Sequence, residues 1–356
     1  MGMNFGLIAG MGMNFRPVAG IKMEKPKSAP PHPVDILALQ AQSQFPYFRR
    51  GHIPGTQIPR FERHPQGRQY HRLQLGLGAT GAESIAFDCE GDGPYVGVSD
   101  GRILKWQGHS VGWTVFAITN PKRSNTCNGL NDSPAEQNCG RPLGLKFNTA
   151  TCELYITDSS VGLVKLDRKG GVATPIATSA EGVTFRFLNT LDIDSETGHV
   201  YFTDSSFRYH RWEFRSINRS DRSGRLLRYD PKTKRVTVLL RGLSFANGVA
   251  LSKNKDFILV TETTTYQVQK YWLTGLKAGT AELFIQLSGR PDNINRNTNG
   301  DFWISQNPTK PIKVNESGTI LESLDTDIIV DASDVTEFHN NLWIGSVIQN
   351  YIIYTS

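Results

Sequence analysis

The sequence predicts an all-β protein, a six-bladed β-propeller with a mostly irregular N-terminal extension. Three observations lead to this prediction. From about Leu73 the chain consists of short β-rich runs that are bounded by Gly, Asp, Asn and Ser at hairpin spacing. One strand-turn-strand unit recurs six times along this part of the chain. No long amphipathic helix interrupts the series, as is typical of propeller blades.

The recurring unit joins a strand that ends in an Asp- or Asn-containing turn to an aromatic or β-branched strand that ends in Asp, Ser or Glu. The six copies begin at Ile85, Leu145, Leu191, Val249, Ile294 and Val335. Their spacing is roughly 40 to 60 residues, as expected for four-stranded blades that cannot bury a face alone. A pair of β-sandwiches is the alternative, but a sandwich does not require one motif to recur around the whole chain.

The predicted domain organisation is an N-terminal extension over residues 1–70 and a propeller over residues 71–356. The extension is rich in Pro, Gly, Arg and His, and neither strand nor helix periodicity is sustained through it. A short helix over residues 36–44 is its one predicted element. Its opening contains no apolar run long enough for a signal peptide or a transmembrane helix, so we expect neither in this chain.

The composition excludes several classes of protein. Hydrophobic residues make up 38% and charged residues 20% of the 356 residues, which excludes a disordered or fibrous chain. The 39 Lys and Arg exceed the 33 Asp and Glu by a net charge of +6, and no run of five or more basic residues occurs. We therefore expect no nucleic-acid partner. The candidate functions given below imply a small-molecule substrate instead.

Residues at equivalent positions of successive blades converge, because the innermost strand of every blade begins beside the central channel. The candidate metal ligands at these positions are Glu83, Asn189, Asn247, Asp292 and Asn293. Carboxylate and amide oxygens suit a hard divalent cation, Ca²⁺ first and Mg²⁺ or Mn²⁺ next, and no Cys or His is placed to favour zinc. The alternative is that each residue is a turn former bonding its own backbone. That alternative does not explain oxygen donors at the inner edges of four blades.

The four cysteines suggest two different environments. Cys127 and Cys139 bracket a polar stretch that a disulfide would close, and two free surface thiols are the alternative. Cys89 and Cys152 adjoin strand-like runs and are expected to be small buried hydrophobes. The glycosylation pattern Asn-x-Ser/Thr occurs at Asn131, Asn218 and Asn315.

From about Gly81 to Ser346 the chain resembles the plant strictosidine synthase-like family. The matching motifs are GAESIAFD, GRILKW, CGRPLG, DIDSETGHVYFTDSS, DRSGRLLRYDPKTK, KYWL, PDNI and NLWIGS, in the family's order. The family is distantly similar to paraoxonases and to the gluconolactonase and senescence-marker group, whose six-bladed propellers hold Ca²⁺ with Glu, Asn and Asp at the axis. The resemblance implies that the five candidate ligands hold Ca²⁺ and that Cys127 pairs with Cys139. It also implies a vacuolar or endomembrane location.

The chain departs from the family at a residue that the strictosidine synthase reaction requires. Strictosidine synthase couples an amine to an aldehyde, and the resemblance places its required glutamate at Ser333. A serine cannot act as that base near neutral pH without an activating partner, and Glu337 is expected in the turn before the last strand, so it is no substitute. The predicted pocket residues are Leu143, Phe187 and Ser333. The wall of this pocket is altered as well, because Leu143, Phe187 and Asn189 stand where the synthase has bulky aromatic side chains.

The predicted metal site and the resemblance together favour a metal-dependent hydrolase of esters or lactones in plant secondary metabolism. The cation would polarise the substrate carbonyl, and a water activated by a carboxylate would attack it. Glu83 and Asp292 are the candidate catalytic bases, with His210 and His339 as chemical alternatives. Two other functions stay open: a condensing enzyme of alkaloid metabolism with an altered site, and a non-catalytic propeller that a bound ion stabilises.

Overall fold

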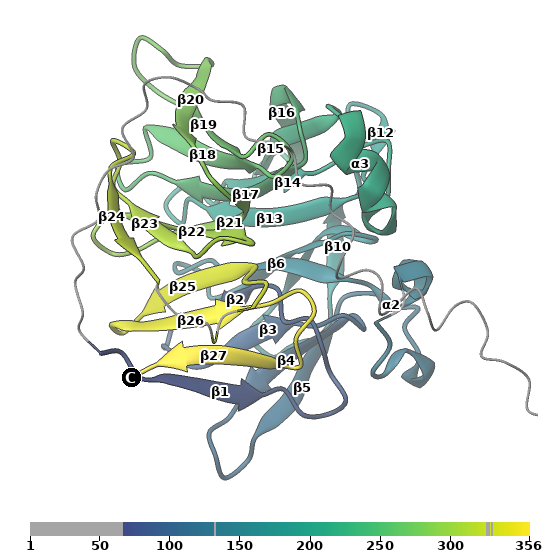
Figure 1. Ribbon diagram of the computed structural model, residues 1–356. Helices are drawn as coiled ribbons and strands as arrows, with labels where there is room; N and C mark the ends of the chain where they lie inside the picture. Colours follow the sequence, from purple (N-terminus) through teal and green to yellow (C-terminus); the bar gives the residue numbers. More distant parts are fainter. Residues whose placement is uncertain (1–66, 132, 325–327, 329) are drawn as a thin grey trace, which may run out of the picture. The chain divides into compact units, whose positions relative to one another are not determined.

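The computed structural model describes residues 67–131, 133–324, 328 and 330–356. Six of the sheets in these ranges stand around a common axis, so the predicted six-bladed β-propeller is confirmed (Figure 1). The predicted extension over residues 1–70, with its helix, lies almost wholly outside the described residues. The first described strand, β1, spans Tyr70–Gln74. The exact boundary between extension and propeller stays a prediction.

The first three blades follow one another along the chain, each with its first strand innermost. Blade 1 consists of β2 (Ile85–Ala86), β3 (Tyr95–Gly97), β4 (Arg102–Trp106) and β5 (Trp113–Ile118), with β9 (Gly171–Val172) parallel to β5. Blade 2 consists of β6 (Pro142–Phe147), β7 (Leu154–Asp158), β8 (Gly162–Leu166) and β10 (Thr174–Ala177). Blade 3 consists of β13 (Leu188–Ile193), β14 (Val200–Asp204), β15 (Gly224–Asp230) and β16 (Arg235–Leu243). A separate hairpin of β11 (Ser179–Ala180) and β12 (Val183–Thr184) precedes blade 3.

The remaining blades complete the ring in the same order. Blade 4 consists of β17 (Ala246–Leu251), β18 (Phe257–Glu262), β19 (Gln267–Trp272) and β20 (Ala281–Gln286). Blade 5 consists of β21 (Arg290–Arg296), β22 (Phe302–Asn307), β23 (Ile312–Val314) and β24 (Ile320–Ser323). Blade 6 consists of β25 (Asp334–Phe338), β26 (Asn341–Gly345), β27 (Tyr351–Thr355) and β1.

Blade 6 closes the ring because it takes its outermost strand from the opposite end of the propeller chain. β1 pairs antiparallel with β27, from Tyr70 opposite Thr355 to Gln74 opposite Tyr351. Leu73 and Leu75 are buried in the apolar cluster that joins blade 6 to blade 1. The pairing therefore satisfies the backbone of β27, which would otherwise be an exposed sheet edge.

The apolar core is divided among the blade interfaces. Six clusters of buried side chains in the described residues each lie between two successive blades. Adjacent residues of one strand serve different interfaces: Tyr201 packs with blade 4, and Phe202 packs with blade 2. This follows from the two-residue period of a strand that is covered on both faces. Each large side chain buried in this way stabilises the fold by roughly 1.5–3 kcal/mol.

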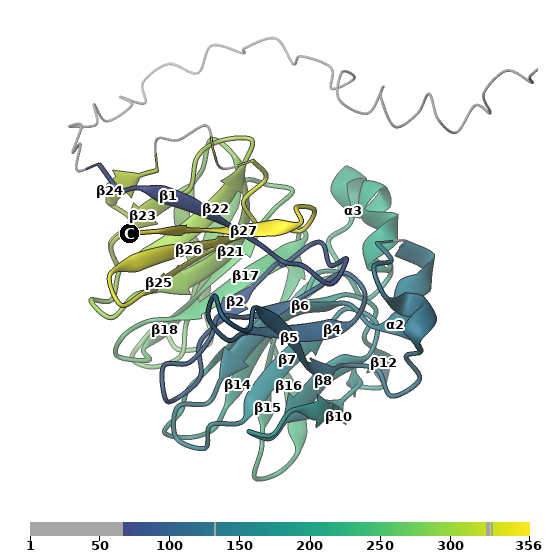
Figure 2. The ribbon, with the colours of Figure 1, turned by 90° about the horizontal axis from the view of Figure 1, so that it is seen from below.

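Two short helical segments form a cap at the end of the propeller where the inner strands begin. The β5–β6 connection contains η1 (Asn125–Cys127), η2 (Ser133–Ala135) and α2 (Glu136–Cys139). The β14–β15 connection contains η3 (Arg211–Glu213) and α3 (Phe214–Ser220). α2 and α3 lie side by side in both views (Figures 1 and 2). Within the described ranges, no helix is long and apolar enough to span a bilayer.

All four cysteines are in disulfides. The Cys127–Cys139 disulfide, with Cα atoms 5.7 Å apart, confirms the predicted pair and encloses the β5–β6 connection. The expectation that Cys89 and Cys152 are unpaired hydrophobes is wrong, because they form a second disulfide with Cα atoms 5.5 Å apart. Cys89 lies in the β2–β3 turn and Cys152 in the β6–β7 turn. The ring brings these equivalent turns of neighbouring blades together, across 63 residues of sequence.

We predict that the two disulfides stabilise the fold unequally. They close loops with sequence separations of 63 and 12 residues, and loop entropy gives roughly 4 and roughly 3 kcal/mol, respectively. Urea unfolding of a Cys89→Ser/Cys152→Ser variant should therefore show the larger loss of unfolding free energy, compared with Cys127→Ser/Cys139→Ser. The reverse order would show that native-state packing, rather than loop length, sets the contribution of each bridge.

Candidate functional site

The candidate site lies at the end of the axis where the inner strands begin. Strand register places one apolar residue of each inner strand, from Ile85 in blade 1 to Val335 in blade 6, at equivalent points of the ring. The residues two positions earlier, here called the axial positions, are Glu83, Leu143, Asn189, Asn247, Asp292 and Ser333 in blades 1 to 6. Four of them are predicted cation ligands. The other two, Leu143 and Ser333, are predicted pocket residues.

A register irregularity marks the axial position in four blades. The strand pairing shifts between Pro142 and Gly144 in blade 2, and at the corresponding place in blades 3, 4 and 5. Such bulges insert an extra residue and re-aim a side chain, and they recur beside functional sites. The repeated bulge therefore explains how a residue at the start of an inner strand turns out of the regular alternation.

Three axial side chains carry buried oxygens without a hydrogen-bond partner. They are Glu83 Oε2, Asn247 Oδ1 and Asp292 Oδ1, and none of them accepts a hydrogen bond from the described residues. Glu83 Oε2 makes an ion-pair contact with Arg141 Nη2 at 3.9 Å. Glu83 and Asn247 are each 4% exposed, whereas Asp292 is half-buried. A buried acceptor left unpaired costs about 1–3 kcal/mol, so three at one level of a channel require an explanation.

Asn189 and Asn293 differ in how their amides are used. The Thr190 hydroxyl lies 2.5 Å from Asn293 Oδ1 and 3.3 Å from Asn189 Oδ1. Because a hydroxyl has one hydrogen, the shorter contact is the hydrogen bond, and the Asn189 oxygen keeps its lone pairs. Asn293 also donates to Ser84 Oγ at 3.2 Å and lies one residue deeper along its strand. Asn293 thus ties blades 1, 3 and 5 together at the axis, and its role as a ligand stays a prediction.

The two axial carboxyl groups are electrostatically coupled. Burial raises the pKa of Glu83 to about 7, against the opposing charges of Arg141 and Arg211. Burial also raises the pKa of Asp292 well above its usual value, and the Glu83 charge raises it further, while the Asn247 amide opposes the shift. Two carboxylates in one buried space repel each other when both are ionised.

A divalent cation fits this donor set. Four axial oxygens, from Glu83, Asn189, Asn247 and Asp292, are free to accept, and two of them carry charge that a cation would neutralise. Among the described residues, no group of three or more His, Cys, Asp or Glu gathers at a metal-ligating distance. The amides therefore have to contribute, and a mixed set of carboxylate and amide oxygens suits Ca²⁺ better than zinc.

A buried arginine adjoins Glu83. Arg141 is 1% exposed, and its Nη2 lies 3.9 Å from Glu83 Oε2. The same guanidinium donates to Ser99 Oγ at 2.5 Å and to the Val347 carbonyl at 3.2 Å. Burial and the nearby Arg211 charge lower the pKa of Arg141 to about 10, so it stays charged at neutral pH. Arg141 was not among the predicted site residues, although it belongs to the CGRPLG motif that carried the resemblance.

An ion pair links the two halves of the cap above Arg141. Arg211 of η3 donates through Nε to Glu136 of α2 at 2.8 and 3.0 Å. Glu136 is buried, and the charges of Arg211 and Glu136 both act on Glu83. Neither cap residue could be found from the sequence, because they are 75 residues apart and follow no motif that the repeat units share.

The predicted pocket residues Leu143 and Phe187 lie under the cap. With Phe245 and Tyr209 they form an apolar cluster around Ile217 of α3, which is fully buried. The structure therefore brings together two of the three predicted pocket residues. It also shows that α3 occupies the apolar wall beside the axial oxygens.

Ser333 has a different environment from Leu143 and Phe187. Its side chain is fully buried, and its hydroxyl donates to the Glu83 carbonyl at 2.8 Å. Glu337 lies within β25, not in a turn, and accepts hydrogen bonds from Trp303 Nε1 and Asn297 Nδ2. It stays unsuited to replace the missing synthase glutamate.

The two alternative histidine bases lie at different ends of the propeller. His339 is exposed in the β25–β26 turn, a full strand length of roughly 16 Å from the axial positions, so it is wrong as a candidate base. His210 precedes η3 in the cap and stacks on Trp212 with ring centroids 4.5 Å apart. His210 thus lies at the same end of the propeller as the axial positions.

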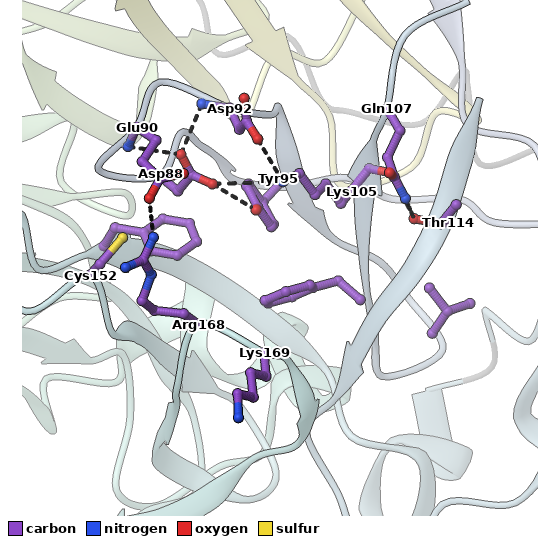
Figure 3. Close-up of a pocket in the computed structure, with 13 residues that line it drawn as sticks. Asp88, Glu90, Asp92, Tyr95, Lys105, Gln107, Thr114, Cys152, Arg168 and Lys169 are labelled. Carbon is purple, nitrogen blue, oxygen red and sulfur yellow. Dashed lines mark hydrogen bonds and ion pairs between the residues drawn. The ribbon is translucent and has the colours of Figure 1, made fainter. Parts of the chain in front are cut away.

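A separate cleft of about 320 Å³ lies between the turns of blades 1 and 2 (Figure 3). Its acidic side chains are already paired: Asp88 accepts from Tyr95, Asp92 pairs with Lys105, and Glu90 pairs with Arg168. The β2–β3 turn that carries them is at the opposite end of the inner strand from Glu83. This cleft therefore takes no part in the axial site.

Comparison with known proteins agrees with this architecture. A strictosidine synthase family profile matches residues 189–276. Strictosidine synthase-like protein 10 of Arabidopsis thaliana is 43% identical over 318 residues, covering 77% of this chain and 85% of that protein. The chain belongs to the strictosidine synthase-like family. The family's protein 3 from the same plant is 37% identical and covers 90% of this chain and 94% of its own length.

Solved structures share the propeller fold of this strictosidine synthase-like protein at low sequence identity. A gluconolactonase of Xanthomonas campestris has a TM-score of 0.61 at 16% identity, covering 81% of this chain and 89% of that one. The calcium-binding protein regucalcin of Agrobacterium tumefaciens has a TM-score of 0.57 at 14% identity, covering 80% and 92%. At these identities the similarity establishes the fold alone.

We predict that the metal-free protein loses stability as the pH rises from about 5 to about 8. The raised pKa of Glu83, about 7, means that the folded state holds a proton that the unfolded chain releases near 4.5. This contribution is complete below the unfolded pKa and disappears as the pH passes the folded pKa, at about 1.4 kcal/mol per pKa unit. Melting curves in chelator should show the fall, and Ca²⁺ should reverse it at pH 8 more than at pH 5.

The control for this experiment is Glu83→Gln, because glutamine does not titrate. In this variant the melting temperature in chelator should fall less steeply as the pH rises. A melting temperature that rises with pH in chelator would contradict the assignment of a proton to the axial carboxylates.

Proposed function

We propose that this protein is a divalent-metal-dependent hydrolase of esters or lactones, with Ca²⁺ as its ion. The observation that carries the proposal is the set of three unpaired buried oxygens, on Glu83, Asn247 and Asp292, at equivalent positions of the ring. The shared fold supports it, because the structural neighbours include a gluconolactonase and a calcium-binding regucalcin.

The residues that would hold the ion are Glu83, Asn189, Asn247 and Asp292, with Asn293 directly beneath them. A bound divalent cation supplies Lewis-acid polarisation of a carbonyl and stabilisation of the resulting oxyanion. Arg141 keeps a positive charge beside Glu83 and thereby favours the ionised form that ligation requires. Asp292 is the candidate base, because burial raises its pKa well above the usual value of an aspartate and its side chain is more accessible than that of Glu83.

The cap gives the site its apolar surroundings. Ile217 of α3 contacts Leu143 and Phe187 and covers them from solvent. The apolar portion of an ester or lactone would pack beside this cluster. The Arg211–Glu136 ion pair holds the two cap segments together and limits access of water.

We also propose an oxidising compartment, vacuolar or endomembrane, for this protein. Two disulfides in one chain are typical of such compartments and rare in the cytosol. Of the proposed glycosylation sites, Asn131 is exposed, whereas Asn218 in α3 and Asn315 are each half-buried. A glycan is therefore expected at Asn131 before Asn218 or Asn315.

The hydrolase proposal predicts which ligands matter most. Glu83→Gln and Asp292→Asn each remove a charge and should weaken Ca²⁺ binding by roughly tenfold or more, and by more than Asn189→Ala or Asn247→Ala. Calorimetry would measure the binding, and a panel of aryl esters and lactones, with and without chelator, would measure activity. The matched control is Glu90→Gln, at the opposite end of the propeller, which should leave both unchanged.

Hydrolysis that survives chelation would contradict the metal-dependent proposal. Ca²⁺ binding that stabilises the fold without turnover of any ester or lactone would instead support the non-catalytic propeller.

A second prediction concerns the reaction of strictosidine synthase itself. The protein should not form strictosidine from tryptamine and secologanin, because Ser333 replaces the required carboxylate and its hydroxyl is bonded to the Glu83 backbone. Ser333→Glu should also fail, because the fully buried site has no room for the longer side chain and Leu143 and Phe187 are covered by α3. Product detected by mass spectrometry with the unmodified protein would restore the condensing-enzyme alternative.

A further inference from the structure

Each predicted ligand that occupies an axial position has its backbone carbonyl held by a hydroxyl from the preceding blade. Thr261 Oγ1 donates to the Asp292 carbonyl at 2.7 Å, and Ser333 Oγ donates to the Glu83 carbonyl at 2.8 Å. The four donors, here called the hydroxyl collar, and their acceptors are Thr157 to Asn189, Thr203 to Asn247, Thr261 to Asp292 and Ser333 to Glu83.

The three threonines of the collar occupy one equivalent position. Thr157, Thr203 and Thr261 stand near the end of the second strand of blades 2, 3 and 4, and all three are fully buried. Each also accepts a backbone N–H from the bulge of its own blade, at 3.1 Å from Gly144, 3.1 Å from Thr190 and 2.6 Å from Gly248. One hydroxyl therefore couples the bulge of one blade to the ligand residue of the next.

The collar is absent where the following axial residue is not a predicted ligand. Gly97 occupies the collar position of blade 1, and the axial residue of the next blade is the apolar Leu143. Ser305 occupies it in blade 5, but its buried hydroxyl has no partner in the described part of the chain. The next axial residue there is Ser333, whose carbonyl accepts instead from the Asn293 N–H at 3.0 Å.

Blade 6 shows how the pattern is kept for Glu83. Its collar position is Gly345, where an added Cβ would lie 2.7 Å from the Glu83 carbonyl oxygen, so a threonine is excluded there. Ser333 of the same blade supplies the hydroxyl instead. The Glu83 carbonyl is thus held in spite of the missing side chain at position 345.

From this correspondence we propose that Thr157, Thr203, Thr261 and Ser333 are positioning residues for a divalent cation at the axis. The inference rests on the proposed function, since it assumes a cation at the axial oxygens. It gives Ser333 a role in place of the synthase glutamate: the hydroxyl orients Glu83 through its main chain.

The narrow range of calcium–oxygen distances explains why the backbone of each ligand has to be held in place. Calcium–oxygen contacts span only about 2.3–2.6 Å, so a ligand backbone that moves by a few tenths of an ångström weakens the site. Removing a collar hydroxyl leaves the ligand's buried carbonyl without its partner and frees the residue to shift. Loss of outer partners of this kind typically weakens metal affinity 10- to 100-fold.

Each test variant removes or keeps one hydroxyl of the collar. Thr203→Val, Thr261→Val and Ser333→Ala should each weaken Ca²⁺ binding, measured by calorimetry on the full chain, by about 10- to 100-fold. Thr203→Ser and Thr261→Ser keep the hydroxyl and should stay within about threefold of the unmodified protein. Ser305→Ala removes the unpartnered hydroxyl at the same position of blade 5 and should leave the affinity unchanged.

Melting temperatures of all variants in chelator separate a local effect from general destabilisation, and Ser333→Ala, which deletes one atom, keeps the test usable if a valine variant fails to fold. If the unmodified protein binds Ca²⁺ and the valine and alanine collar variants bind it equally well, the positioning role is wrong and the proposed function stands. The positioning role is also wrong if Ser305→Ala weakens binding as much as the collar variants do. If the unmodified protein binds none of Ca²⁺, Mg²⁺ and Mn²⁺, both proposals are wrong.

Discussion

The pairing of β1 with β27 is the constraint on which the rest of the structure depends. It joins the two ends of the propeller chain into one blade and closes the ring. Each blade can bury its faces only against its neighbours, so an open ring would expose two apolar faces at once. Closure also fixes the axis, and six residues at one strand register become neighbours because their blades are held around it. A site built from Glu83, Asn247 and Asp292 exists only in the closed form.

The axial site is destabilising by itself and needs compensation. Three unpaired oxygens and two coupled carboxyl groups are buried at one level of the channel. Arg141 offsets part of the Glu83 charge, and its position follows directly after the Cys127–Cys139 disulfide and Gly140. The disulfide, α2 and the Glu136–Arg211 pair therefore connect the cap to the carboxylates. The contacts that hold the cap together therefore also influence the charge of the axial carboxyl groups.

The bulges and the hydroxyls between blades determine how the axial residues are oriented. Inner strands in regular alternation would direct successive side chains into the two blade interfaces, where the apolar clusters lie. A bulge at the axial position frees one residue from that alternation, and in blades 2 and 4 the glycine after it, Gly144 or Gly248, lets the next blade approach. An added Cβ on Gly248 would lie 2.7 Å from the Asp292 carbonyl oxygen, so close packing of blades and placement of ligands use the same positions.

The sequence alone determined the fold class, the family and the axial ligand candidates, because these depend on local patterns: the period of the repeat, the strand alternation and the residue before each inner strand. It also determined Cys127 with Cys139, which are 12 residues apart. Only the tertiary structure decided the Cys89–Cys152 bridge, the Arg141–Glu83 contact and the position of α3 over Leu143. Those contacts depend on which side chains of neighbouring blades meet when the blades pack side by side, and the strand pattern within one blade does not specify them.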